Sequence, residues 1–97
     1  MKAELYDQAN EGGHTTISLE LNPDGSVQLF YHDVGPAALE MFGDSDYEAW
    51  LTVSAASVPA LCFALLKQGF SGDGQALTRA RDLCNRSGID HEFGVWT

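Results

Sequence analysis

The sequence predicts an α+β fold, in which two helices pack on one face of a mainly antiparallel sheet of four to five strands. Three observations predict it: two alternating segments around a Pro-Asp-Gly turn, a third alternating segment, and two amphipathic segments nearer the C-terminus. One sheet face is expected to be apolar, and each helix is expected to carry one apolar stripe. A two-layer sandwich buries these apolar surfaces against one another. At 97 residues the chain has room for a single domain, which we place over residues 1–97.

The strongest signal is a β-hairpin. Apolar and polar side chains alternate over 16–21 and again over 27–32, on either side of the turn sequence NPDG at 22–25. Proline presets φ in such a turn and glycine takes its left-handed position. A third alternating run, 47–53, should pair in the same sheet, and segments 2–6 and 91–96 are expected as shorter strands near its edges.

Two segments of helical periodicity follow the strands. Ser57 is a favourable N-cap for the first helix, and Gly88 is a natural residue to end the second. We expect the apolar stripes of both helices to cover the sheet face that carries Ile17, Leu29 and Leu51.

Charge is distributed unevenly along the chain. Fourteen acidic and five basic residues give a net charge of −9. All of this excess lies in residues 1–56, where Lys2 is the only basic residue, and the charges balance over 57–97. Binding to nucleic acid or to an anionic membrane is disfavoured, because either requires a basic patch. A basic protein partner is compatible with this charge.

The termini and the cysteines indicate a cytoplasmic protein. No charged segment leads into an apolar run at the N-terminus, and the longest apolar stretch, 58–66, is too short to span a bilayer. Cys62 and Cys84 are not in a CxxC pair, and both lie in predicted helices. We expect two free thiols in a reducing compartment, with a disulfide between the helices as the alternative.

Four segments together resemble a small bacterial protein family of unassigned function. They read HDVGP at 32–36, GDSDYE at 43–48, WLTV at 50–53 and CNRSGIDHEF at 84–93. The resemblance covers most of the chain from the hairpin onward. It implies a bacterial origin and a compact α+β fold, and it implies no reaction.

Alternating carboxylates at Asp44, Asp46 and Glu48 suggest a site for a hard cation. An EF-hand loop starting at Asp44 would need glycine at its sixth position and glutamate at its twelfth, where Ala49 and Ala55 stand. A solvated acidic stretch at the start of a strand explains the pattern. We therefore expect no metal and no other cofactor.

His32 and nearby carboxylates could supply a general acid and base. Asp33 is adjacent in sequence, and Glu48 is expected across the sheet. No serine lies in a nucleophile motif and neither cysteine has a histidine nearby, so we assign no catalytic residue. The sequence favours a role without catalysis. The alternative is a small metal-assisted or acid–base hydrolase using His32, Asp44, Asp46 and Glu48.

The sheet face turned away from the helices is predicted to carry large aromatic side chains beside carboxylates. Exposed aromatic residues rimmed by charge often mark interaction surfaces. We expect this face to bind a protein, such as a basic protein that the chain antagonises, or a second copy in a homodimer. The predicted binding residues are Tyr6, Phe30, His32, Asp44, Asp46, Glu48, Trp50 and Trp96. Alternatively, residues 7–15 or 37–42 fold over this face and bury it as a second small core.

Overall fold

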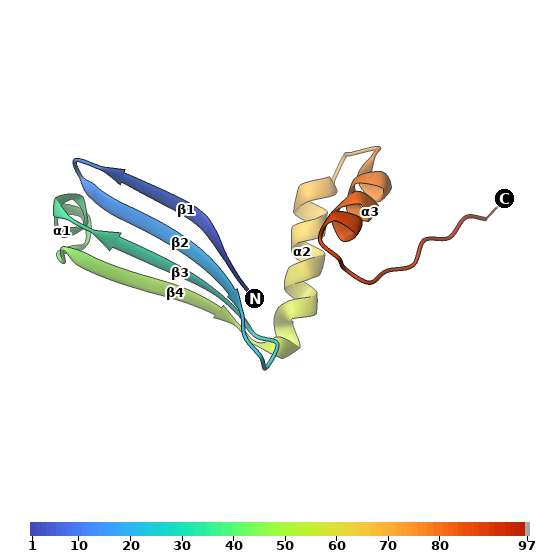
Figure 1. Ribbon diagram of the computed structural model, residues 1–97, viewed down its shortest axis with the longest axis horizontal. Helices are drawn as coiled ribbons and strands as arrows, with labels where there is room; N and C mark the ends of the chain where they lie inside the picture. Colours follow the sequence, from blue (N-terminus) through green and yellow to red (C-terminus); the bar gives the residue numbers. More distant parts are fainter. Residues whose placement is uncertain (97) are drawn as a thin grey trace. The chain divides into compact units, whose positions relative to one another are not determined.

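The computed structural model describes residues 1–96, and the chain divides into two compact units. The first unit is Met1–Leu61 and the second begins at Cys62. Within residues 1–96, a four-stranded antiparallel sheet and three α-helices confirm the α+β class (Figure 1). The single domain over 1–97 and the covering of the sheet by two helices stay predictions.

The sheet is a meander in which each strand pairs with the next along the chain. Its order is β1-β2-β3-β4, and all three pairings are antiparallel. The strands are β1 (Lys2–Asn10), β2 (Gly13–Leu21), β3 (Val27–Val34) and β4 (Asp46–Val53).

The predicted turn between β2 and β3 is confirmed. Gly25 adopts a left-handed φ of 89°. The Asp24 carboxylate accepts hydrogen bonds from the backbone N–H of Ser26 at 2.9 Å and from its hydroxyl at 2.6 Å. The N–H of Asn22 donates to the Ser26 carbonyl at 2.9 Å. These short-range bonds fix the register of the hairpin.

Directly opposed residues of neighbouring strands share one side of a sheet, so the register defines two faces. The apolar face carries Ala3, Tyr6, Gln8, Thr15, Ile17, Leu19, Leu21, Val27, Leu29, Tyr31, Asp33, Tyr47, Ala49, Leu51 and Val53. The polar face carries Lys2, Glu4, Asp7, Ala9, His14, Thr16, Ser18, Glu20, Gln28, Phe30, His32, Val34, Asp46, Glu48, Trp50 and Thr52.

A β-bulge in β1 places Tyr6 on the apolar face. Glu4 lies opposite Ser18 and Tyr6 lies opposite Ile17, which leaves Leu5 as an extra residue in β1. An extra residue reverses the alternation beyond it. The prediction that Tyr6 shares a face with Phe30 and Trp50 was therefore wrong, because it assumed an unbroken strand.

A short helix, α1 (Pro36–Phe42), connects β3 to β4 (Figure 1). The Phe42 ring stacks on Tyr47 of the apolar face, with ring centroids 3.9 Å apart. Gly13, at the start of β2, has a φ of +133°. A Cβ atom at this position would lie 2.0 Å from the Val34 carbonyl oxygen. Glycine is thus required at the start of β2.

The helices α2 (Val58–Phe70) and α3 (Ala76–Arg86) follow the sheet in sequence, and α2 is preceded by a 3₁₀ turn. The end of α3 is closed by a Schellman motif, in which the N–H of Ile89 donates to the Cys84 carbonyl at 2.9 Å and Gly88 adopts a φ of 65°. The predicted C-terminal stop is therefore confirmed. The second unit, which begins at Cys62, contains an apolar groove of about 560 Å³. It is lined by Phe63, Leu66, Lys67, Phe70, Ser71, Ala76, Leu77 and Ala80.

The predicted strand over 91–96 was wrong, since these residues form no β-strand. Instead, the guanidinium carbon of Arg81 in α3 lies over the Phe93 ring, 3.9 Å from the ring centroid. Alternation alone does not make a strand, which also needs a neighbouring backbone to pair with.

Cys62 and Cys84 are free thiols. No helix within residues 1–96 is long and apolar enough to cross a membrane.

Candidate functional site

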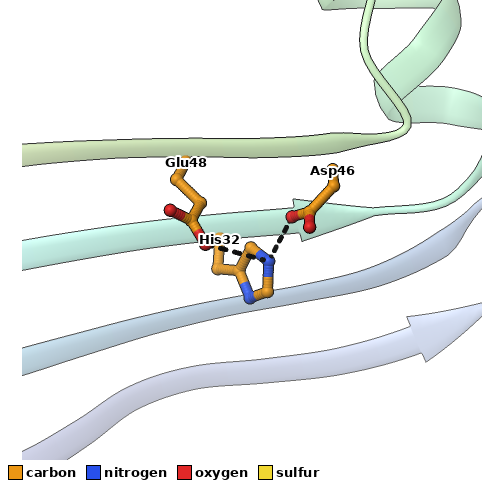
Figure 2. A group of neighbouring side chains, drawn as sticks. All are labelled: His32, Asp46 and Glu48. Atoms are coloured by element: carbon orange, nitrogen blue, oxygen red, sulfur yellow. Dashed lines mark hydrogen bonds and ion pairs between the residues drawn. The ribbon is translucent and has the colours of Figure 1, made fainter.

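A histidine and two carboxylates meet on the polar face of the sheet (Figure 2). His32 on β3 lies directly opposite Glu48 on β4, and Asp46 is two residues from Glu48 on the same side of that strand. The Nε2 atom of His32 is 2.6 Å from Oδ1 of Asp46 and 3.7 Å from Oε1 of Glu48. The expected position of Glu48 across the sheet from His32 is confirmed.

Asp33 is not part of this site, because adjacent residues of a strand point to opposite faces. Its carboxylate accepts hydrogen bonds from the hydroxyls of Thr15 at 3.0 Å and Tyr31 at 3.2 Å on the apolar face. Asp33 is buried, with 7% of its surface exposed. The hypothesis that Asp33 acts with His32 as a general acid and base was therefore wrong, and the carboxylate that contacts His32 is Asp46.

The site is open to solvent. The exposed fractions of the His32, Asp46 and Glu48 side chains are 33%, 65% and 51%. Ion pairs this exposed add little to folding stability, so stability alone does not account for the cluster. Each carboxylate also keeps lone pairs that a ligand from solution can reach.

A second histidine–carboxylate pair lies at the other side of the polar face. The His14 ring on β2 is hydrogen-bonded through Nε2 to the Asp7 carboxylate on β1. This bond lowers the pKa of Asp7, and hydrogen bonding to Asp7 together with its charge raises the pKa of Glu4. Sequence reasoning missed this pair because it ended the first strand at Tyr6. Residues 7–10 carry no alternation of apolar and polar side chains, so no local signal in the sequence indicated this pair.

Aromatic side chains adjoin the His32 site. Phe30 and Trp50 lie directly opposite each other on β3 and β4, and the Phe30 ring centroid is 6.1 Å from that of His32. Trp50 is 63% exposed, while Phe30 is half-buried. The segment 7–15 forms the paired ends of β1 and β2, so it does not fold over Trp50.

The segment 37–42 does not cover the aromatic side chains either. It belongs to α1, whose Phe42 stacks on Tyr47 of the apolar face, the side opposite Trp50. Neither covering segment considered from the sequence therefore buries this tryptophan as a second core.

The remaining predicted residues lie elsewhere. Asp44 precedes β4, and its carboxylate accepts a hydrogen bond from the backbone N–H of Asp46 at 3.0 Å, which shapes the entry to the strand. Trp96 is 98% exposed in the C-terminal segment of the second unit. The polar face thus brings together Phe30, His32, Asp46, Glu48 and Trp50, and leaves out Tyr6, Asp44 and Trp96.

The chemistry available at this face is proton exchange, cation binding and contact with a partner. A histidine within hydrogen-bond distance of a carboxylate can take part in acid–base steps. Covalent catalysis would also need a nucleophile activated by that histidine. Within residues 1–96, no hydroxyl or thiol is hydrogen-bonded to His32.

No protein-family model, no curated protein and no solved structure matches this chain. The resemblance to a small bacterial family stays a prediction.

Proposed function

We propose that this protein is a binding module whose polar face engages a basic protein partner. The observation that supports it best is Trp50, which is 63% exposed beside Phe30, with carboxylates on the same face. Tryptophan is a frequent energetic anchor of interfaces, and a charged surround sets the choice of partner. A large aromatic side chain this exposed contributes little to folding, so binding is the better reason for it.

The charge of the face indicates the chemistry of the partner. Lys2 is its only lysine or arginine, and its acidic residues are Glu4, Asp7, Glu20, Asp46 and Glu48. Such a field attracts lysine and arginine side chains and speeds their association. A second copy of the chain would bring carboxylates against carboxylates, which opposes a homodimer through this face. Antagonism of a basic protein in the bacterial cytoplasm is one form of this role.

The proposal can be tested with displayed peptide libraries rich in lysine and arginine, with aspartate- and glutamate-rich libraries as the control. We expect cationic peptides to be enriched. Trp50→Ala should weaken their binding by at least about tenfold, because an interface anchor contributes roughly 2 kcal/mol. The matched control is Trp96→Ala, which removes an exposed tryptophan that is not part of the sheet. Binding should also weaken as salt rises above about 0.15 M, where charges are screened.

Stability and oligomeric state are the accompanying controls. Because Trp50 is exposed, Trp50→Ala should change the free energy of unfolding by no more than about 1 kcal/mol. A variant that unfolds would identify Trp50 as a core residue and contradict the proposal. Sedimentation equilibrium should show a monomer. A dimer that Trp50→Ala dissociates would identify a second copy as the partner.

A second candidate is an acid–base or metal-assisted hydrolase that uses His32, Asp44, Asp46 and Glu48. The contact of 2.6 Å between His32 and Asp46 supports it. The hydrogen bond between the Asp44 carboxylate and the Asp46 backbone speaks against a direct role for Asp44. Hydrolysis of a nitrophenyl ester or phosphate that His32→Gln abolishes and His14→Gln preserves would favour the enzyme over the binding module.

A further inference from the structure

We propose that His32, Asp46 and Glu48 bind one divalent transition-metal ion of the zinc class. The site draws one side chain from β3 and two from β4, on the polar face of the sheet. It shares Asp46 and Glu48 with the acidic surface offered to the proposed partner, but the ion itself requires only residues of this chain.

The distances between the donor atoms fit a small ion. In a tetrahedral zinc site with bonds of about 2.0–2.1 Å, two donors lie roughly 3.3 Å apart. One donor atom from each of the three side chains lies within 4.8 Å of the others. The His32 Nε2 atom is 2.6 Å from Asp46 and 3.7 Å from Glu48, values on either side of that spacing. Small side-chain rotations would therefore admit the ion without a change in strand register.

The donor types indicate which ions suit the site. Imidazole nitrogen favours zinc, copper, nickel and iron, whereas calcium and magnesium prefer sites made of oxygen alone. Three protein donors leave one position of a tetrahedral ion free for water or another ligand. The Asp46 and Glu48 carboxylates are about half exposed or more, so an ion can reach them from solvent.

No metal was expected from the sequence because residues 44–55 do not fit a calcium loop, although a metal-assisted hydrolase using His32, Asp44, Asp46 and Glu48 was the alternative. The donors of the proposed site come from two strands and not from a single loop. His32 lies near Asp46 and Glu48 because β3 pairs with β4.

The other histidine pair of the polar face serves as an internal control. His14 and Asp7 are also a hydrogen-bonded imidazole and carboxylate, both about half exposed. Glu4 interacts with the Asp7 carboxylate, and no second acidic donor joins His14 to complete a three-residue set within residues 1–96. His14 should thus bind the ion more weakly than His32.

The test is calorimetric titration of the full chain with zinc chloride in a non-chelating buffer. We expect one ion per chain. His32→Gln should weaken its binding by at least about tenfold, since it removes the nitrogen donor. The matched variant His14→Gln should leave the affinity unchanged within about twofold. Circular dichroism should show that both variants keep the secondary structure of the original chain.

Metal selectivity and the ring resonances complete the test. Excess calcium or magnesium should not displace zinc, and zinc should shift the NMR resonances of the His32 ring more than those of His14. Four results would each overturn the proposal. These are binding that survives His32→Gln, loss of binding in His14→Gln, equal competition by calcium, and no saturable binding up to about 1 mM zinc. None of them bears on capture of cationic peptides through Trp50, so the two proposals fail separately.

Discussion

The two faces of the sheet are built from alternate residues of the same strands, yet they hold their carboxylates differently. On the apolar face Asp33 is buried and accepts hydrogen bonds from Thr15 and Tyr31. On the polar face Asp46 is mostly exposed and contacts His32. A buried carboxylate with fixed donors serves the fold, whereas an exposed one remains available to a ligand.

The aromatic side chains differ between the faces in the same way. On the apolar face the Tyr47 ring stacks on Phe42 and meets Tyr31 edge-on, with ring centroids 6.1 Å apart. On the polar face Trp50 is largely exposed. Aromatic rings that contact one another stabilise a fold, and an exposed ring beside carboxylates offers contact area to a partner.

The largest expected effect is on the buried carboxylate. Asp33→Ala would leave the hydroxyls of Thr15 and Tyr31 without their acceptor, and we expect it to lower the free energy of unfolding by about 1–3 kcal/mol. The matched change on the other face, Asp46→Ala, should cost less than about 1 kcal/mol, because Asp46 is exposed. Urea unfolding of both variants measures the difference. Equal losses would contradict the functional separation of the two faces.

Much of this fold could be predicted from the sequence because its signals are local. The alternation in β2, β3 and β4 and the turn at Gly25 depend on residues close together in the chain. The bulge beside Tyr6 could not be predicted, because it exists only in the pairing of β1 with β2. The length of β1 was missed for the same reason, since its outer half is polar and is stabilised by its partner strand.

The residues of the candidate site were predicted better than the contacts between their side chains. Alternation placed Phe30 and Trp50 on one face and His32 opposite Glu48. Which carboxylate contacts His32 depended on how the β4 side chains lie along β3, and the structure shows Asp46. Asp33 was expected to act with His32 because it is the next residue in the sequence. Neighbouring residues of a strand point to opposite faces, so the two side chains do not meet.

A smaller effect is expected at alkaline pH on the apolar face. Partial burial raises the pKa of Tyr31, and hydrogen bonding to Asp33 and the charge of Asp33 raise it further. Its contribution to stability is then full below the unfolded value of about 10 and is lost as pH rises through the higher folded value. The stability difference between the original chain and Tyr31→Phe should therefore shrink in urea unfolding above about pH 10.

The control for this prediction is Thr15→Val, which removes the other hydroxyl donor to Asp33. The threonine hydroxyl does not ionise in this range, so its stability difference should persist where that of Tyr31→Phe declines. Parallel behaviour of the two variants through pH 8 to about 11 would show that ionisation of Tyr31 is not linked to folding.

The smallest expected effect concerns Asp7 on the polar face, whose pKa is lowered chiefly by its hydrogen bond to His14. A carboxyl group with a lowered folded-state pKa stabilises the fold above its unfolded value of about 3.9, and this contribution is lost as pH falls through the folded value. His14→Gln should therefore raise the pKa of Asp7, as followed by NMR titration of its carboxyl carbon. His32→Gln should leave that titration unchanged, because His32 pairs with Asp46 instead. If Asp7 titrates identically in the original chain and in His14→Gln, the two histidine–carboxylate pairs are not the separate units that the structure shows.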